Sequence, residues 1–406
     1  MAFLAVMPGS VVPSIEVAVD FDNDPTAGTT TWTDVTPYVV AYSRNPVRTN
    51  EFDQPGVCTG QITLRNDDAR FIPDNVAGPY FGKLKKLRRV RVRAQWGGVT
   101  YNRFWGYVDD WPQSWDEYGR DQSVTLQIKD GLTPLETFDL VGQDFPAVSA
   151  SGSAVAQVLT AAGITARSLD TGQSPIPDSG TLSSTFALQR VHDIAASENG
   201  VVFADGGGTI EFHDRRHRLT QSAVVQGTIG DAPGEIPYTN PQPLFGDVWP
   251  IVTVTANGGT LEMSTDAAGT ASYYQRTLAF PPSGTYLVAS QAEAKAATQY
   301  LVNRYAAPVT RVASVDLIGA RSPSLWGPIL NLDTSDRVIF RRRFLSNGTV
   351  AGTVQVDGFV EGYGETVKIG ESWVVSVPIS PADLQSYWLA GDAVYGLAGE
   401  TTRAGY

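Results

Sequence analysis

The sequence predicts a mainly β protein of the α+β class, in which two antiparallel β-barrel or sandwich domains flank a small α/β domain. Hydrophobic residues make up 42% of the 406 residues and charged residues only 18%, a balance typical of folded rather than disordered chains. The 40 Gly and 25 Pro are spread along the whole length, which favours many short strands joined by turns. Strand-like alternation recurs towards both ends of the chain, and helical patterns separate the two regions.

Residues 1–144 are expected to form the N-terminal β domain. Six segments there are rich in β-branched or aromatic residues at period two and are bounded by Gly, Asn, Asp or Pro. The expected strands are 11–19, 30–40, 60–64, 90–94, 100–108 and 124–128. So many short strands in a single region favour a sandwich or a small barrel.

Residues 145–224 are expected to form the small α/β domain, with two helices and a β-hairpin. Ser151 precedes a helical run that ends at Gly163, a residue suited to a helix C-terminus. A second helical run covers 184–200, and a hairpin with the glycine turn Asp205-Gly-Gly-Gly208 follows it. Because this turn leads into a strand and not a helix, a phosphate-binding loop is disfavoured.

Residues 225–388 are expected to form the second β domain, with an inserted helix at 290–305, and residues 389–406 a C-terminal tail. Ser290 and Glu293 have the spacing of a capping box at the start of that helix, and Pro308 requires it to end before that residue. The expected strands are 252–255, 273–280, 311–318, 337–340, 353–360 and 373–377.

The charge and cysteine content exclude several classes of protein. The net charge of −12 disfavours a protein that holds nucleic acid through its phosphates, since such binding needs a basic surface. Cys58 is the single cysteine, so neither an intrachain disulfide nor a cysteine-built metal site is expected. No stretch approaches the ~20 apolar residues of a membrane-spanning helix, and no secretory signal is apparent. Synthesis and assembly in the cytoplasm are therefore expected.

Three groups of residues have types that could form a catalytic or metal site, and each has a simpler explanation. His213 and His217 have a metal-compatible spacing, but two arginines separate them. The Asp-rich segments 22–24 and 66–68 suit turns better than Ca²⁺, because the remaining features of a calcium loop are missing. The acid pairs near tryptophans, Asp109–Asp110 and Asp116–Glu117, fall on neighbouring strand positions whose side chains diverge. No catalytic residue, cofactor or metal is assigned, and an enzyme is not expected.

The strongest electrostatic feature is a run of seven basic residues within Lys83–Arg93. From Arg89 to Arg93 arginine alternates with valine, so one strand face is apolar and the other cationic. One interpretation is a solvated sheet face, and the other is a contact with an acidic surface on a neighbouring copy or subunit. A second cluster lies at residues 341–343. The candidate assembly interface comprises Lys83, Lys85, Lys86, Arg89, Arg91, Arg93, Arg341, Arg342 and Arg343.

A series of weak motifs, in one order along nearly the whole chain, resembles the minor tail proteins at the tail tips of actinobacterial siphophages. The motifs are residues 23–39, 60–75, 78–80, 103–108, 191–200, 208–215, 303–308, 336–338 and 379–382. In layout the chain is also similar to the baseplate hub proteins of contractile tails, whose two β-barrels flank smaller α/β parts. Unlike some relatives, its hub pattern has no lysozyme or peptidase extension, so wall degradation is not expected.

This resemblance implies a structural protein of the virion tail tip. Three copies would form a ring that joins the tail tube to a fibre or spike and surrounds the channel for DNA and the tape-measure protein. DNA would pass without being specifically bound. The alternatives are a hexameric distal tail adaptor and, in a different class, a receptor- or glycan-binding tail module.

Overall fold

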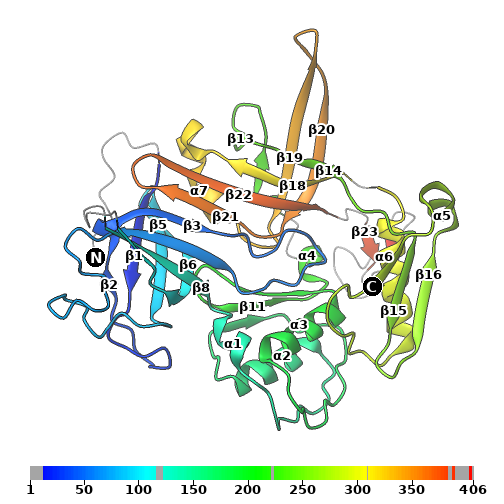
Figure 1. Cartoon of the computed structure of the whole chain (residues 1–406). Helices are drawn as coiled ribbons and strands as arrows, with labels where there is room; N and C mark the ends of the chain where they lie inside the picture. Colours follow the sequence, from blue (N-terminus) through cyan, green and yellow to red (C-terminus); the bar gives the residue numbers. More distant parts are fainter. Residues whose placement is uncertain are drawn as a thin grey trace.

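Strands from both ends of the chain belong to one continuous sheet (Figure 1). The structure, a computed structural model, describes residues 12–115, 122–220, 224–308, 310–382, 386–388 and 402–404. Within these residues 16 strands pair into the main sheet, and the remaining strands form three small sheets. The mainly β class with a small α/β part, predicted from composition and periodicity, is confirmed.

The N-terminal half of the main sheet is fully antiparallel. Its strands are β1 (Ser14–Val19), β2 (Thr33–Asp34), β3 (Val39–Arg44), β4 (Thr59–Arg65), β5 (Arg89–Trp96), β6 (Val99–Asp110), β7 (Gln113–Ser114) and β8 (Ser123–Asp130). They follow the order β3-β4-β8-β6-β5-β1-β2, and β7 pairs with β8. The strand expected at 30–40 is divided, because Pro37 lies in a 3-10 turn, Thr36–Tyr38, which separates β2 from β3.

The C-terminal half contributes strands of more varied length. They are β12 (Gly227–Ile229), β13 (Tyr238–Thr239), β14 (Pro243–Phe245), β18 (Thr310–Leu317), β19 (Arg337–Ser346), β20 (Thr349–Val360), β21 (Gly364–Lys368) and β22 (Ser372–Pro381). Their order is β12-β19-β20-β22-β21, while β18 pairs with β22, β13 and β14. Short helical segments at Gly319–Arg321, Pro323–Leu325 and α7 (Trp326–Asn331) connect β18 to β19.

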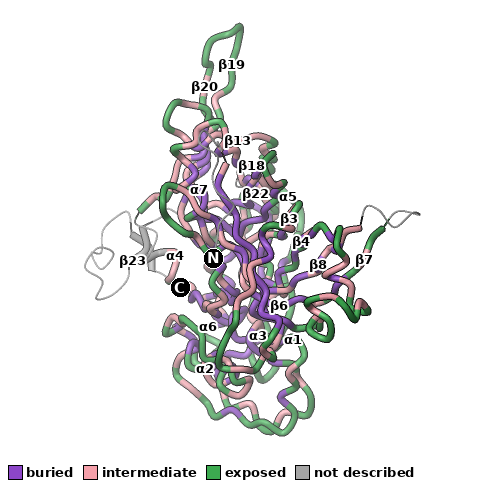
Figure 2. The backbone as a smooth tube through the Cα atoms, turned by 90° about the vertical axis from the view of Figure 1, so that its left-hand side faces the viewer, coloured by how far each residue is buried: buried purple, intermediate pink, exposed green. Residues whose placement is uncertain are grey.

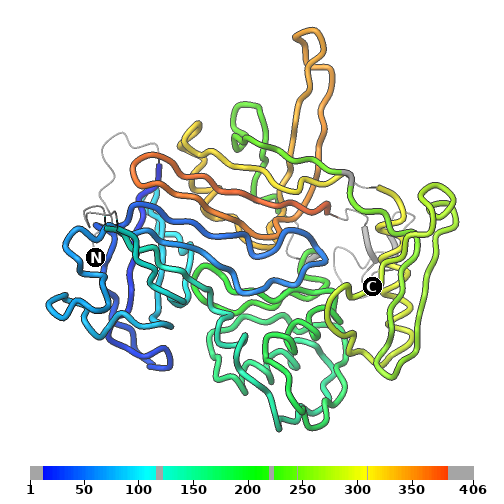
Figure 3. Tube along the Cα trace, viewed as in Figure 1, coloured from blue at the N-terminus to red at the C-terminus, as the bar shows by residue number. Residues whose placement is uncertain are grey.

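The two halves meet where β21 pairs with β3, from Glu365 opposite Arg44 to Lys368 opposite Ala41. Figure 3 shows the blue and orange traces running side by side there. Buried polar contacts reinforce the seam: Arg103 Nε donates to Glu365 Oε1 at 3.0 Å, and Arg44 donates to the Arg103 carbonyl at 2.7 Å. Two β domains were predicted; their strands are present, but hydrogen bonds join them edge to edge.

The middle of the chain forms the predicted α/β unit. Its elements are α1 (Thr133–Thr137), α2 (Ser151–Ala161), β9 (Arg167–Leu169), α3 (Ala187–Glu198), β10 (Val201–Ala204), β11 (Ile210–His213) and α4 (His217–Thr220). Both helices and the hairpin agree with expectation, but two end residues differ in role. Ser151 does not cap α2, since its Oγ donates to buried Glu198. Asn199, in the left-handed conformation at φ 55°, ends α3 one residue before Gly200.

Residues 251–305 form a small unit with its own three-stranded sheet, here called the side lobe. It contains β15 (Ile251–Thr255), β16 (Leu261–Thr265), α5 (Ala267–Tyr273), β17 (Thr277–Phe280) and α6 (Gln291–Tyr305). The strand order is β16-β15-β17, so β16 is an edge strand. The strand expected at 273–280 begins only at Thr277, because Asp266 caps α5 by accepting from the Gly269 N–H.

Two hydrophobic cores divide the molecule differently from the predicted domain borders. One core lies within the main sheet and draws residues from both ends of the chain, such as Val17, Leu126 and Val375. The other joins the α/β unit to the side lobe, through residues such as Val191 and Leu301. The borders at 144, 224 and 388 remain predictions. The tail beyond 388 lies almost entirely outside the described residues, apart from β24 (Thr402–Ala404), which pairs with β23 (Ser386–Trp388).

One hairpin leaves the body of the molecule, and we call its outer part, residues 341–356, the arm. Figures 1 and 2 show β19 and β20 rising above the main sheet, with exposed residues towards the tip. Pairing of β19 with β12 stops at Phe340, and pairing of β20 with β22 stops at Gly358. Asn347 and Gly348 both have positive φ, 52° and 81°, as a tight two-residue hairpin turn requires. No helix in the described parts is long and apolar enough to span a membrane.

Candidate functional site

The basic strand β5 has its acidic partners inside the chain. Glu16 of β1 is fully buried and stands opposite Arg93 in the strand register, with Arg91 diagonal to it. Its two oxygens accept from both guanidinium groups, at 2.9 Å from Arg91 Nη2 and 3.1 Å from Arg93 Nε. Arg89 is also buried and donates to Asp20 Oδ2 at 2.9 Å. The alternation of Arg and Val therefore serves packing between neighbouring strands.

This arrangement corrects one part of the sequence interpretation. Arg89 was expected on a cationic outer face, but its side chain is only 7% exposed. Reversing the charge of all three arginines would leave Asp20 and Glu16 buried without cations, so the fold would not survive that change intact. Arg91 and Arg93 keep 15% and 23% exposure, and their role in assembly remains a prediction.

The three lysines of the same segment lie at the surface. Lys83 Nζ is 2.6 Å from Asp22, and Lys86 Nζ is 3.9 Å from Asp110; both pairs are about half exposed. Lys85 is exposed, and its backbone carbonyl accepts from the Trp111 indole at 3.0 Å. Exposed ion pairs of this kind contribute little to stability, so these lysines are available to a partner at low cost.

A hollow of about 240 Å³ lies beside Arg91 and Arg93. Trp32 and Trp105 line it, and the Arg91 guanidinium stands 4.5 Å from the centre of the Trp32 ring. Gly206 and Gly207 of the glycine turn form one wall, and Gly208, at φ 90°, packs directly against Trp105. A Cβ at Gly206 would lie 2.4 Å from the Asn102 carbonyl oxygen. The turn thus docks the α/β unit on β6.

The second basic cluster lies on the arm. Arg341 and Arg343 reach back to the loop after β12, where Glu235 lies 3.3 Å from Arg341 Nη1 and 3.0 Å from Arg343 Nη1. Arg343 also pairs with Asp231. Hydrogen bonding from Arg343 outweighs partial burial and lowers the pKa of Glu235 to about 2. Arg342 is exposed and has no ion-pair partner among the described residues.

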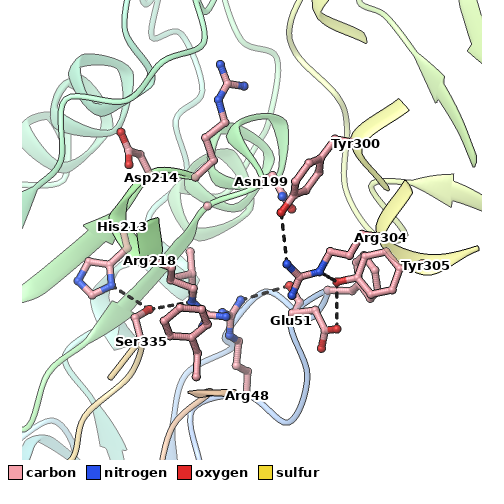
Figure 4. Close-up of a pocket in the computed structure, with 15 residues that line it drawn as sticks. Arg48, Glu51, Asn199, His213, Asp214, Arg218, Tyr300, Arg304, Tyr305 and Ser335 are labelled. Carbon is pink, nitrogen blue, oxygen red and sulfur yellow. Dashed lines mark hydrogen bonds between the residues drawn. The ribbon is translucent and has the colours of Figure 1, made fainter. Parts of the chain in front are cut away.

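A charged, buried site next to a cavity was not predicted. The cavity, of about 80 Å³, lies where the main sheet, the α/β unit and the side lobe meet, and Arg48 and Arg218 are among its lining residues (Figure 4). These two arginines enclose Glu361, which follows β20, is fully buried and does not itself line the cavity. Its oxygens lie 2.5 Å from Arg48 Nη2 and 2.7 Å from Arg218 Nη1. Arg48 follows β3 and Arg218 belongs to α4, so one carboxylate connects three separate parts of the chain. We call these residues the junction triad.

The electrostatics of the junction triad favour the ionised form of the Glu361 carboxylate. Burial alone would raise the pKa of Glu361, but Arg218 and Arg48 outweigh burial and lower it to about 2. A second acid, Glu51, accepts from Tyr305 of α6 at 3.0 Å and from Ser380 of β22 at 2.6 Å. These contacts cross-link the main sheet to α4 of the α/β unit and to α6 of the side lobe.

The two histidines of the candidate pair stack on each other and form hydrogen bonds within the chain. The two rings stack with centroids 3.4 Å apart, and their nitrogens bind Ser335 and Asp170, at 3.2 and 2.8 Å. Burial lowers the pKa of His213, which favours the neutral ring. Among the described residues no cluster of three His, Cys, Asp or Glu side chains is arranged to hold an ion.

The other acidic candidates form local hydrogen bonds. In the first Asp-rich segment Asp20 accepts from the Asn23 backbone at 3.1 Å, and in the second Asn66 accepts from the Phe71 N–H at 2.9 Å. Asp109 and Asp110 point to different lysines, Lys129 and Lys86. Asp116 and Glu117 lie outside the described residues.

The fold of this chain is similar to that of solved phage tail proteins, although its sequence matches no known family. No protein family and no curated protein sequence matches the chain. Solved structures do match: the prophage MuSo2 43 kDa tail protein from Shewanella oneidensis aligns with a TM-score of 0.55 at 13% identity, over 90% of this chain and 97% of its own. A tail protein from Neisseria meningitidis MC58 aligns with the same score at 12% identity, over 91% and 96%. A type VI secretion system component of E. coli reaches only 0.46 at 8% identity, over 86% and 74%. The chain therefore has a phage tail protein fold.

Proposed function

We propose that this protein is a non-enzymatic structural subunit of a phage tail tip, where three copies form a ring-shaped hub between the tail tube and a fibre or spike. The observation that carries the proposal is the fold, which matches two tail proteins across about nine-tenths of the chain. The continuous sheet supports it too. Because β3 and β21 hydrogen-bond, each copy presents two β-rich halves as one stiff unit. Three such units would offer six similar β-rich halves to a sixfold tube.

The charge of the chain is compatible with a position around the exit channel. With a net charge of −12, the surface as a whole repels phosphate groups. DNA would then slide past without being held. Neighbouring tail proteins, including the tube or a distal tail ring, the tape-measure protein and a fibre or spike, are the partners that this position implies.

A map of the assembled particle tests the proposal. We expect density for this chain at the tail tip, in three copies around the tail axis. Six copies around the tube end would instead support a distal tail adaptor, and absence from the tail would contradict both. Native mass spectrometry of the purified ring gives an independent copy number.

The hollow lined by Trp32 and Trp105 favours a second candidate, a glycan-binding tail module. Two tryptophans beside arginine and asparagine side chains resemble the mixed apolar and polar lining of ligand sites. Binding of cell-wall glycans by the wild-type protein, lost in Trp105→Ala, would support it. Equal signals for the two proteins on a glycan array would leave the hollow as a packing feature.

A further inference from the structure

The arm is the most exposed apolar element of the main sheet. Its exposed apolar side chains are Phe344, Leu345, Val350 and Val354, with exposed fractions of 49%, 65%, 59% and 39%. A two-stranded ribbon that stands alone is marginally stable in water, and free strand edges tend to pair with other chains. Such a surface indicates a contact site rather than ordinary solvent exposure.

Apolar side chains occupy both faces of the arm. Arg342 pairs with Val354 and Phe344 with Gly352 in the register, so these residues share the face that continues from buried Phe340. After the register shift Leu345 pairs with Val350 at the tip, on the opposite face. The Phe344 ring lies across Gly352, where a Cβ would be 2.4 Å from its Cζ, so the ring is held in place although exposed.

The charge of the arm identifies the kind of partner. Residues 341–356 contain three arginines and no carboxylate, so once these are set aside the remainder of the −12 chain carries −15. Asp231 and Glu235 of the same chain pair with Arg341 and Arg343, so Arg342 is the cation that the apolar arm can still offer, while the body that carries it is acidic. A second copy of this chain offers the complementary charge. Duplex DNA is the less suitable occupant, because Asp231 and Glu235 already neutralise two of the three arginines.

The side lobe carries a surface that suits the arm. β16 is one of the two edge strands of its sheet, and Leu261 and Met263 on that strand are 62% and 52% exposed. Tyr274, just beyond α5, is 87% exposed. Figure 1 shows the lobe at the side of the molecule, whereas the arm points away from the body. An arm and a receiving strand at different places on one chain make a head-to-tail contact, which generates a closed ring when the rotation between copies fits.

We propose that the arm of one copy packs on edge strand β16 of the next copy, where Leu345 and Val350 cover Leu261 and Met263. The contact buries apolar side chains of both copies, and it does not depend on backbone pairing at Met263, whose carbonyl accepts from Lys295 Nζ within the same chain. It rests on the proposed ring and names the surface that joins its subunits.

Cysteine cross-linking of the full-length chain tests this contact. Cys58, the native cysteine, is only 4% exposed, so disulfides between copies should form through the introduced cysteines alone. Val350→Cys protein mixed with Leu261→Cys protein should form a covalent dimer under mild oxidation, which neither protein forms alone. Protein that carries both Val350→Cys and Leu261→Cys should form a series of cross-linked oligomers on a denaturing gel, and the largest should contain as many copies as the ring. Val350→Cys mixed with Val76→Cys, an equally accessible control at 75% exposure, should give at least tenfold less dimer.

A second measurement uses the variant Phe344→Asp/Leu345→Asp. We expect unchanged circular dichroism and melting temperature, and at least a tenfold weaker association constant in sedimentation experiments, with Val76→Asp as the matched control. Three results would overturn the inference. The variant could associate as strongly as wild type, or the wild-type chain could stay monomeric at every concentration. The arm could also prove necessary for binding duplex DNA or another tail protein. A threefold ring seen in the particle without the cross-link would reject this contact and leave the proposed function standing.

Discussion

Strand β5 and the arm look alike in sequence, yet the fold uses them in opposite ways. In β5 arginine alternates with valine, and in the arm three consecutive arginines precede apolar residues. β5 is flanked by β1 and β6, and its arginines bind the buried acids Asp20 and Glu16. The arm leaves its neighbouring strands after Phe340, and its tip is exposed. Arg341 and Arg343 at the base of the arm still pair with Glu235 and Asp231, so the contrast with β5 concerns Arg342 and the exposed apolar residues of the tip.

The difference has an energetic origin. A guanidinium between two strands can be matched by a carboxylate held at a fixed register, and removal of either group leaves a buried charge. A guanidinium on a projecting ribbon stays hydrated, so its loss costs the folded chain little. We therefore expect substitutions of interior charges to change the free energy of unfolding, and substitutions on the arm to change association.

The largest effect is expected at the junction triad. Glu361→Gln leaves Arg48 and Arg218 buried beside a neutral amide, which should lower the free energy of unfolding by about 3–5 kcal/mol. Urea denaturation at pH 7 measures this change. Asp22→Asn, which removes an exposed pair with Lys83, is the control and should cost less than about 1 kcal/mol. Equal effects for the two variants would contradict a structural role of the triad.

The junction triad should also make stability depend on pH. The pKa of Glu361 is lowered in the folded protein, from 4.5 to about 2, so folding favours the ionised form. Its contribution is present above pH 4.5 and should be lost as the pH falls towards 2. Wild type should therefore lose more stability than Glu361→Gln across this interval, as measured by denaturation at several pH values. Parallel curves would show that the carboxylate is not the group responsible.

A smaller loss is expected at β5. Glu16→Gln removes the carboxylate that Arg91 and Arg93 share, and because both arginines are partly exposed, water can compensate in part. We expect a loss of about 2 kcal/mol in the free energy of unfolding. If the variant is as stable as wild type but assembles poorly, the contrast between β5 and the arm would be wrong.

Within the arm, the turn should show a local effect. Gly348 has φ 81°, so Gly348→Ala places a Cβ in the left-handed region and should destabilise the hairpin by about 1 kcal/mol. Amide hydrogen exchange should become faster in residues 341–356 alone, while the melting temperature of the whole protein stays unchanged. Faster exchange in the main sheet as well would mean that the arm is part of the global folding unit.

The smallest effect on stability is expected at Arg342, which is exposed and has no ion-pair partner among the described residues. Arg342→Glu should change the free energy of unfolding by less than about 0.5 kcal/mol. The comparison with Glu16→Gln is direct, because each variant changes the charge of one arginine cluster. A loss as large as that of Glu16→Gln would place Arg342 among the structural arginines.

Local patterns predicted the elements of this fold better than their assembly. Alternation located β4, β5 and β8, and the glycine turn located the β10–β11 hairpin, because those signals depend on neighbouring residues. The Ser290–Glu293 pattern located α6, although only the serine side acts as expected: Glu293 binds Ser174 instead. The seam between β3 and β21 left no such local signal, since its partners are distant in sequence.

The candidate site was predicted in part for the same reason. The arginines of β5 were identified from their spacing, but Glu16 and Asp20 were not recognised as their partners, because pairing depends on register between strands. Glu361 has no local signal, since both of its arginines lie far away along the chain. The arm had one: Asn347-Gly348 between alternating residues is a strong hairpin signal. The sequence did not reveal that the strands of this hairpin extend beyond the strands that pair with them in the main sheet.

The seam between β3 and β21 has a consequence for how the protein is made. Arg44 and Glu365 pair across more than 300 residues, so the ribosome must synthesise almost the entire chain before the edge of β3 is covered. At roughly 5–20 residues per second, that edge stays open for about 15–65 seconds. During this interval nascent copies can join to one another through β3, and a chaperone that shields this strand would determine the yield of soluble protein.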